Sequence, residues 1–348
     1  MAKGPMKKIL VTGGAGYIGS HTVVELVNVG YAPVIIDNFS NSEKSVLDGL
    51  KAITGKEQVL YEGDCNDGAF LARVFGKEPG IEGIVHFAAY KAVGESTQKP
   101  LDYYENNVGS LLKLLRAMPE HRIASLVFSS SCTVYGQPEA EHLPVREDSP
   151  RQKAQCPYGN TKKICEDILE DVIASKAPLK IVALRYFNPI GAHSSALIGE
   201  LPIGVPNNLV PFVTQTAAGI REKLTVFGDD YNTPDGTCIR DYIHVVDLAR
   251  AHVRAIEYLN KQTQPSFYDV FNLGTGKGSS VLEVIKTFER VSGKPLNYVI
   301  GARRPGDIET VYSAVEKAVK VLGWKAELTL ADALRDSWRW QERLSGGR

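Results

Sequence analysis

Cysteine is scarce in this sequence, and its spacing indicates neither a disulfide framework nor a metal site. The 348 residues contain five cysteines, an odd number, with no Cys-x-x-Cys pair. They are Cys65, Cys132, Cys156, Cys165 and Cys238. The seven histidines likewise show no His-Glu-x-x-His spacing, so we expect no metal ion. Scattered thiols are typical of a reducing compartment, and we expect a cytoplasmic protein.

Net charge and long apolar runs are also missing. Forty basic side chains balance forty acidic ones, so no net field attracts the protein to nucleic acid or to a membrane surface. No apolar run approaches the roughly 20 residues that span a bilayer. The basic start is followed by only a short apolar run, residues 9–11, and we expect no secretory signal. With 43% hydrophobic and 23% charged residues, the composition is that of a soluble globular chain with one large or two modest domains.

The rest of the chain is organised around residues 7–21, KKILVTGGAGYIGSH. Residues 9–11 predict a short buried strand, and the periodic apolar residues after the glycines predict an amphipathic helix. The glycines between them are Gly13, Gly14, Gly16 and Gly19. Without Cβ atoms the backbone can turn sharply and admit a pyrophosphate, which the first N–H groups of the helix can bind. The stretch predicts a dinucleotide site, with an ordinary glycine turn as the alternative.

A carboxylate follows at the position where such a unit binds the ribose. The apolar run at residues 33–36 ends in Asp37, roughly 20 residues after the turn. A carboxylate accepts hydrogen bonds from ribose hydroxyls but repels the 2′-phosphate of NADP, and no arginine occurs in residues 38–42. The sequence therefore predicts NAD as the cofactor.

Strand-like stretches alternate with helix-like stretches through the first half of the chain. They cover residues 59–63, 84–88, 125–130 and 180–187. This alternation predicts an α/β fold with a doubly wound parallel sheet, which binds ligands beyond the carboxyl ends of its strands. The residues that follow the strands should line one crevice: 64–65, 87–91, 129–133 and 187–189.

The pattern changes after about residue 191, where loops rich in glycine and proline separate shorter elements. We expect a dinucleotide-binding domain at residues 1–190 and a smaller α/β lobe at 191–348, with segments of about 242–275 packing back on the first domain. In the lobe we expect helices at 208–220, 245–259, 280–291, near 314–322 and at 330–343, a strand at 224–227 and a further segment at 298–301.

The strongest chemical signal is Tyr158 and Lys162, four residues apart on one face of a predicted helix. Chance alone gives roughly one such spacing, but this pair follows a strand that ends in serines and so lies at the mouth of the crevice. The ammonium and the nicotinamide ring both favour the phenolate, which can take a hydroxyl proton as the adjacent carbon gives up hydride. Ser131 can hydrogen-bond the same oxygen. A surface helix pair and a plain turn serine are the alternatives.

These motifs together resemble the extended short-chain dehydrogenase/reductase superfamily, whose marks are Gly-x-x-Gly-x-x-Gly, a serine after the fifth strand and Tyr-x-x-x-Lys. Over nearly its whole length the chain resembles, more closely, the UDP-glucose/UDP-galactose 4-epimerase family. The segments that carry this resemblance are VTGGAGYIGSHT, IIDNFSNS, VHFAAYKAVGEST, PLDYYENN, SSSCTVYG, LRYFNPIGAH, VPNNLVPFV, DGTCIRDYIHVVDLA, FNLGTG and RRPGD. So many long segments in order are more specific than any single motif.

The resemblance implies a Rossmann domain that retains NAD, with Tyr158, Lys162 and Ser131 as catalytic residues. It assigns residues of the glycine turn, residues at the adenosine ribose and residues at the adenine to successive parts of the NAD site. The implied cofactor-binding residues are Gly13, Gly16, Tyr17, Ile18, Gly19, Asp37, Asn38, Phe39, Ser40, Asn41, Ser42, Asp64, Cys65, Phe87, Ala88, Ala89, Tyr90, Lys91, Asn107, Ser131, Tyr158, Lys162 and Phe187.

The resemblance also implies a UDP-sugar substrate held largely by the second lobe. The implied substrate-binding residues are Lys91, Ser131, Tyr158, Asn188, Asn208, Leu209, Thr225, Val226, Phe227, Arg240, Arg304, Asp307 and Val311. Arg240 and Arg304 would hold the diphosphate, and Asp307 the uridine ribose. Two arginines supply the local positive charge that a neutral protein needs for a diphosphate. Taken singly, each arginine can equally be a surface ion-pair residue.

The implied reaction is reversible 4-epimerisation of UDP-glucose and UDP-galactose through a 4-keto sugar. A nucleotide-sugar 4,6-dehydratase is the nearest alternative, but it needs an Asp-Glu pair where this chain has Cys132, Thr133 and Val134. A non-catalytic NAD-sensing scaffold has no need of the Tyr158 and Lys162 pair. Two departures from the family pattern, Cys132 and the Asn160-Thr161 pair, replace no proposed catalytic group.

Two finer expectations come from the resemblance alone. The residue that matches Val311 acts as a gate, and a valine of intermediate size predicts that UDP-N-acetylhexosamines are also accepted. A homodimer is implied, for which the helices at residues 101–118 and 156–175 can pair across a two-fold axis, with ordinary packing helices as the alternative.

Overall fold

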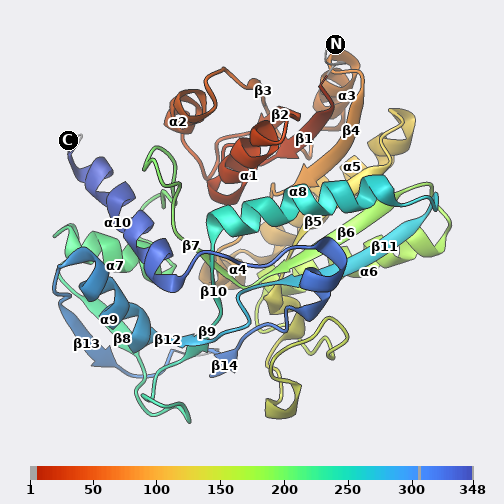
Figure 1. The fold of residues 1–348 in the computed structure, drawn as a ribbon. Coiled ribbons are helices and arrows are strands. Elements are labelled where there is room, and N and C mark those ends of the chain that lie inside the picture. Colours follow the sequence, from red (N-terminus) through yellow and green to blue (C-terminus); the bar gives the residue numbers. More distant parts are fainter. Residues whose placement is uncertain (1–5, 305–306, 347–348) are drawn as a thin grey trace. The chain divides into compact units, whose positions relative to one another are not determined.

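The computed structural model describes residues 6–304 and 307–346 of the chain (Figure 1). It contains two compact units, each assembled from three segments. The first unit comprises Met1–Gly136, Pro150–Arg185 and Ala249–Phe271, and the second comprises Gln137–Ser149, Tyr186–Leu248 and Asn272–Arg348. The domain boundary expected after residue 190 stays a prediction. Residues 1–5, 305–306 and 347–348 of the two expected domains lie outside the described ranges.

A seven-stranded sheet forms the centre of the first unit, in the order β11-β6-β5-β4-β1-β2-β3. Its strands are β1 (Lys8–Thr12), β2 (Ala32–Asp37), β3 (Val59–Glu62), β4 (Ile81–His86), β5 (Ser125–Ser131), β6 (Lys180–Tyr186) and β11 (Phe267–Leu273). The neighbours from β3 through β2, β1 and β4 to β5 all pair in parallel. The order reverses between β1 and β4, which is the switch point where doubly wound sheets bind their ligands. The predicted α/β fold with a doubly wound parallel sheet is confirmed.

Helices cover the sheet of this unit on both faces. They are α1 (Tyr17–Asn28), α2 (Ser45–Thr54), α3 (Gly68–Lys77), α4 (Val93–Gln98), α5 (Pro100–Glu120), α6 (Pro157–Ala174) and α8 (Val245–Lys261). Apolar residues of α3, α5 and α6 form one core with alternate residues of the strands, including Leu10, Ile84 and Leu126. Figure 1 shows α1 and α8 crossing in front of the sheet. This two-sided burial explains why the strands are almost continuously apolar.

The described residues of the second unit form three small sheets. Strands β7 (Asn188–Ile190) and β10 (Tyr242–His244) form one pair, and β8 (Leu224–Phe227) and β13 (Tyr298–Gly301) form another. The third sheet has the order β12-β9-β14, from β12 (Ser279–Ser280), β9 (Ile239–Arg240) and β14 (Thr310–Val311). Helices α7 (Leu209–Ala217), α9 (Val281–Ser292) and α10 (Leu330–Gly346) pack against a core that includes Val213, Phe288 and Trp338.

One predicted element is shorter than expected. The helix expected near residues 314–322 covers residues 316–322, of which Ala318–Leu322 are π-helical, and it ends at Gly323 in the left-handed conformation. The residues before it form a bridge instead: Val145 pairs with Ser313, and Ala314 N donates to Val145 O at 2.7 Å. Two short 3₁₀ turns, Cys132–Tyr135 and Ala140–His142, complete the secondary structure described here.

None of the helices within residues 6–304 and 307–346 has the length and apolar character that crossing a membrane requires.

Candidate active site

The glycine turn joins β1 to α1 through a backbone that side chains would block. Gly13 has φ +70°, and a Cβ atom there would lie 2.9 Å from Ala88 N. A Cβ atom on Gly19 would overlap the carbonyl oxygen of Gly13. In the described first turn of α1 no side chain caps the helix and no acidic residue is present. The turn is therefore a glycine-lined cradle at the positive end of a helix, which fits the pyrophosphate of a dinucleotide.

Asp37, at the end of β2, organises the loop that faces this turn. Its Oδ2 accepts a hydrogen bond from Ala15 N at 2.9 Å, and its Oδ1 accepts from Phe39 N and Ser42 Oγ, both at 2.9 Å. These bonds use three of the roughly four lone-pair sites of a carboxylate, which leaves about one for a ribose hydroxyl. Phe39 adopts φ 55°, a left-handed conformation that is unusual for a bulky residue. The other residues assigned to the ribose, Asn38, Ser40 and Asn41, are exposed on the same loop.

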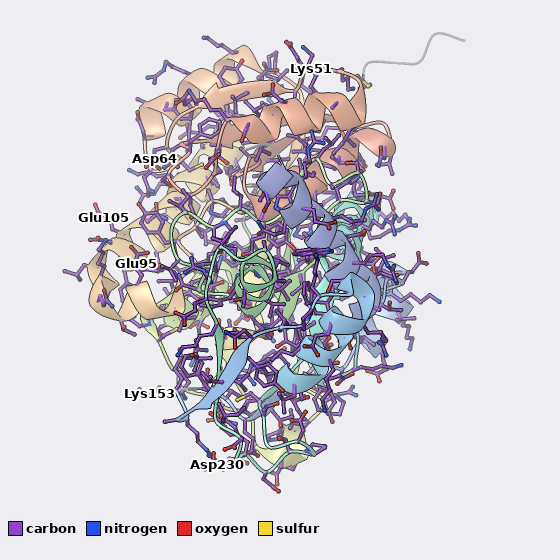
Figure 2. All side chains as sticks on the ribbon, turned by 90° about the vertical axis from the view of Figure 1, so that its left-hand side faces the viewer. Lys51, Asp64, Glu95, Glu105, Lys153 and Asp230 are labelled. Atoms are coloured by element: carbon purple, nitrogen blue, oxygen red, sulfur yellow. The ribbon has the colours of Figure 1, made fainter. Side chains whose placement is uncertain are left out.

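The two residues assigned to the adenine differ in exposure. Asp64 is exposed on the loop after β3 (Figure 2), where its Oδ1 accepts a hydrogen bond from Asn66 N at 2.8 Å. Cys65 is buried, and this burial, together with the nearby charge of Asp64, raises the pKa of its thiol to about 12. Cys65 is therefore a neutral thiol that packs in the core.

Asn107, on α5, ties the loop after β4 to the start of α6. Its Oδ1 accepts a hydrogen bond from Tyr90 N at 2.8 Å, and its Nδ2 donates to Tyr90 O and to Thr161 Oγ1, both at 3.0 Å. Phe87, Ala88 and Ala89 precede Tyr90 on this half-buried loop, and the exposed Lys91 ends it, with Nζ 5.9 Å from the ring centre of Tyr17. Tyr17 and the half-buried Ile18 open α1, so the loop and the glycine turn lie side by side.

The structure brings Ser131, Tyr158 and Lys162 together at the carboxyl end of β5. Helix α6 begins at Pro157, a residue favoured in the first turn, and presents Tyr158 and Lys162 one turn apart. Ser131, the last residue of β5, is hydrogen-bonded to Tyr158. The Nζ of Lys162 donates to Ser129 O at 2.6 Å and lies 6.0 Å from the ring centre of Tyr158. Serine, phenol and ammonium are therefore neighbours, as the sequence motifs predicted.

Burial shifts the pKa values of the two titratable groups of this cluster in opposite directions. It lowers the pKa of Lys162 to about 8, against the opposing influence of Cys165 and Glu166. It raises the pKa of Tyr158, while the hydrogen bond with Ser131 acts the other way. Both shifts favour the neutral form. The phenolate expected from the sequence must therefore form against burial, with the hydrogen bond from Ser131 acting in its favour.

Two buried polar residues near this cluster were not singled out from the sequence. His86, at the end of β4, lies with Nδ1 2.7 Å from Thr12 Oγ1, and burial followed by the charge of Lys162 lowers the pKa of its imidazole to about 3. Glu166 lies one turn beyond Lys162 on α6 and accepts hydrogen bonds from Arg185 Nη2 at 2.6 Å and from Ser130 Oγ. The helical spacing of Tyr158, Lys162 and Glu166 is the signal by which Glu166 was detectable.

Two of the residues assigned to the substrate meet in the β12-β9-β14 sheet of the second unit. Arg240 on β9 pairs with Val311 on β14. Its Nη1 donates to the carbonyl oxygen of Ile239 at 2.9 Å and to that of Glu309 at 3.5 Å. The guanidinium is therefore supported by main-chain carbonyls of β9 and of the residue that precedes β14.

A second group gathers around Arg304. Its Nη2 lies 2.6 Å from Asp307 Oδ1, and its guanidinium carbon lies 5.6 Å from the ring centre of Phe227 on β8. Thr225 and Val226 precede Phe227, and Val226 is buried in the core whereas Phe227 is 44% exposed. The two residues assigned to the diphosphate and the uridine ribose therefore pair with each other in this structure.

The remaining assigned residues of the second unit lie on other segments. Asn208 precedes α7 and donates from Nδ2 to Glu200 Oε1 at 2.7 Å, and the half-buried Leu209 is the first residue of that helix. Phe187 N donates to Leu273 O at 3.1 Å, and Asn188 N to Asp241 O at 2.9 Å. Asp241 was not singled out from the sequence, although it lies next to Arg240 and is fully buried.

Comparisons with known proteins add to this geometry. A family model described as GDP-mannose 4,6 dehydratase matches residues 10–337. The UDP-glucose 4-epimerase of Bacillus subtilis (strain 168) is 52% identical over 339 residues, which cover 97% of this chain and 98% of the relative. These names favour the epimerase expectation over the dehydratase alternative within the family that the model describes.

Two solved structures are similar over nearly their whole length. The crystal structure of UDP-glucose 4-epimerase from Stenotrophomonas maltophila, with bound NAD and formylated UDP-arabinopyranose, has a TM-score of 0.94 and 46% identity, covering 99% of this chain and 100% of that one. The enzyme from Bifidobacterium longum, in complex with NAD+ and UDP, has a TM-score of 0.92 and 48% identity, covering 98% and 100%. With about half of its residues shared along its whole length, the chain belongs to the UDP-glucose 4-epimerase family.

Proposed function

We propose that the chain inverts the configuration at C4 of UDP-glucose and UDP-galactose, in both directions, with NAD as a bound cofactor. The observation that carries this proposal is the cluster of Ser131, Tyr158 and Lys162 at the carboxyl end of β5. The same end of the sheet holds the glycine turn after β1 and the loop after β4, on either side of the point where the strand order reverses. Relatives that share about half of the sequence carry the corresponding name.

The residues of the first unit fit NAD. The cradle of Gly13, Gly16 and Gly19 would hold the pyrophosphate at the start of α1, and Asp37 would hold the adenosine ribose with its remaining lone pair. Asn107 would fix the loop at Tyr90 beside the nicotinamide half. Bound NAD supplies the acceptor and the donor of hydride for C4 of the sugar.

The chain's own part in the chemistry is to move a proton. Tyr158, once ionised, takes the proton of the sugar 4-hydroxyl on its phenolate oxygen and later gives it back. Ser131 hydrogen-bonds to Tyr158 and can hold the same sugar oxygen, so the proton has a short path. Lys162, fixed on Ser129 O, supplies positive charge beside the phenol, which offsets part of the cost of ionising it in a buried place.

Inversion requires that the 4-keto sugar present its opposite face before it is reduced. The protein must therefore bind the nucleotide tightly and leave the hexose free to rotate. Arg240 and Arg304 would bind the diphosphate, and Asp307 the uridine ribose. In this state Arg304 is paired with Asp307, so binding exchanges that ion pair for contacts with UDP.

One assay separates this function from its alternatives. The purified protein is incubated with UDP-galactose without added reductant, and the nucleotide sugar is identified. UDP-glucose supports the epimerase, a 4-keto-6-deoxy sugar supports a dehydratase, and unchanged UDP-galactose contradicts both. NAD released from the denatured protein, measured in parallel, tests whether the cofactor stays bound.

Val311 supports a wider substrate range. It is 3% exposed and lies opposite Arg240 in the sheet that we assign to the substrate. A valine leaves more room than a bulky gate residue would, so we propose that UDP-N-acetylglucosamine and its galacto epimer are also substrates. Absence of turnover on both would refute this range without touching the main activity.

We also propose a homodimer formed through α5 and α6, and a cytoplasmic location. Leu101 and Leu112 on α5 are 78% and 37% exposed, which leaves apolar side chains on this helix that a second copy would cover. All five cysteines are free thiols, as in proteins of reducing compartments.

A further inference from the structure

Asp241 is a buried carboxylate with an unusually full set of hydrogen bonds. It has no exposed surface and follows Arg240 directly, between β9 and β10. Its Oδ1 accepts from Thr275 N at 2.8 Å and from Thr275 Oγ1 at 2.7 Å. Its Oδ2 accepts from Gly276 N at 3.1 Å, Ser313 N at 3.1 Å and Ser313 Oγ at 2.6 Å. Five donors from two distant segments therefore share one carboxylate.

The segments that Asp241 connects carry residues assigned to the substrate. Ser313 lies two residues beyond Val311 on the β14 segment, and β14 pairs with β9 at Arg240. The main-chain oxygen of Asp241 also accepts a hydrogen bond from Asn188 N at 2.9 Å. The other neighbour of β9 in the sheet is β12, which follows Thr275 and Gly276 in the sequence. Asp241 thus fixes both neighbours of β9 to the strand that bears the arginine.

Arg240 depends on this arrangement for its own position. Its guanidinium donates to carbonyl oxygens of β9 and of the residue before β14, Ile239 and Glu309. Those two carbonyls keep their spacing only while β9 and β14 keep their register. Asp241 secures that register from the far end through Ser313.

We propose that Asp241 is a positioning residue for the diphosphate-binding Arg240. This inference rests on the proposed function and deepens it: Asp241 acts on the affinity for the nucleotide through Arg240, and it touches neither the sugar nor the cofactor. The segments that contain Thr275 and Ser313 come from different parts of the chain, and both donate hydrogen bonds to the Asp241 carboxylate. A carboxylate accepts from both sides at once, whereas an amide cannot.

Asp241→Asn tests this idea because the change keeps the shape. The amide offers one acceptor oxygen, and its NH₂ group then faces main-chain N–H groups, Thr275 on one side or Gly276 and Ser313 on the other. A matched control is Asp247→Asn. Asp247 is also buried in the second unit, and its Oδ2 accepts from Glu327 N at 2.8 Å and Leu328 N at 2.7 Å, on a segment without assigned substrate residues.

The measurements are KM and kcat for UDP-galactose, dissociation constants for UDP and for uridine by calorimetry, bound NAD, and the melting temperature. We expect Asp241→Asn to raise KM and the dissociation constant for UDP at least about tenfold, with kcat and NAD content little changed. Uridine, which lacks the diphosphate, should lose much less affinity. Asp247→Asn should lower the melting temperature without changing the affinity for UDP.

A double-variant cycle decides whether Asp241 acts through Arg240. Arg240→Gln combined with Asp241→Asn should bind UDP no more weakly than Arg240→Gln alone. Independent losses that multiply, or an Asp241→Asn variant that behaves like Asp247→Asn, would overturn the proposal. If Asp241→Asn does not fold, Ser313→Ala removes one donor and should weaken UDP binding in the same direction, whereas unchanged binding would overturn it. A wild-type protein that neither binds UDP nor turns over UDP-galactose would instead refute the proposed function.

Discussion

At the scale of single residues, Tyr158 carries the proposed chemistry because its phenol is the group whose proton can leave and return. We expect Tyr158→Phe to lower kcat by about 10²–10⁴-fold, the usual contribution of a general base, while bound NAD and the melting temperature stay near wild type. Tyr104→Phe is the matched control. Tyr104, on α5, accepts a hydrogen bond at 2.7 Å from Nδ2 of Asn160, which lies on α6 with Tyr158, but Tyr104 is not part of the cluster. Near-normal turnover by Tyr158→Phe would contradict the assignment.

Lys162 leads to a prediction about how stability changes with pH, which can be tested without an activity assay. Burial lowers the pKa of its ammonium from 10.5 to about 8, so between about pH 8 and pH 10.5 the unfolded state binds one proton more than the folded state. Stability must then rise with pH in this window, by about 1.4 kcal/mol per pH unit. Urea unfolding at several pH values should show the wild type gaining stability relative to Lys162→Met across the window. A difference that does not change with pH would contradict the lowered pKa.

The sequence motifs identified those site residues whose contact follows from their local spacing in a helix or from their place at a strand end. Tyr158 and Lys162 are one helical turn apart, and Ser131 ends a strand, so their meeting followed from helix and sheet geometry. His86 and Asp241 were missed because their partners are distant in sequence: Thr12 is 74 residues from His86, and Ser313 is 72 residues from Asp241. No local pattern reveals which polar side chains tertiary folding will bury together.

At the scale of elements, the turn between β1 and α1 is shaped by close packing as well as by its dihedral angles. We expect Gly19→Ala to lose bound NAD and to lower the melting temperature, because its Cβ would overlap the Gly13 carbonyl and force the turn open. Absorbance of the cofactor released on denaturation measures the loss.

Gly76→Ala is the matched control for that variant. Gly76 lies inside α3, and its Cβ would meet no described atom within 4 Å. The substitution should raise stability by roughly 0.5–1 kcal/mol, since alanine is the better helix former. Unchanged NAD binding in Gly19→Ala would contradict the role of close packing at the turn.

The strands and long helices were predictable because their apolar patterns are strong and their ends carry local signals. Helix α6 begins at Pro157, and α9 is capped by Ser280 Oγ, which accepts from Glu283 N at 3.0 Å. The helix expected near residues 314–322 begins two residues late for a tertiary reason. Val145 and Asp241 hold Ser313 and its neighbours in a bridge, which leaves residues 316–322 to form the helix.

At the scale of the whole molecule, the proposed dimer makes a prediction about assembly. Leu112→Glu places a charge on the exposed face of α5 and should convert the protein to a monomer, as light scattering coupled to size exclusion would show. Val299→Glu is the control, because Val299 is 41% exposed on β13 of the second unit, close to the 37% of Leu112. A wild-type monomer, or a Leu112→Glu variant that remains dimeric, would contradict the α5 interface.

The segmented make-up of the first unit has a consequence for its synthesis. Its N-terminal segments end at Arg185, but β11 and most of α8 come from Ala249–Phe271, after 63 intervening residues. At 5–20 residues per second, a ribosome needs roughly 3 to 13 seconds to make those 63 residues. Throughout that interval β6 has no outer neighbour, and Gly83 on β4 lacks the Ile256 side chain that later packs against it. An open strand edge is a template for wrong pairing, so the nascent chain is most prone to aggregate in this interval.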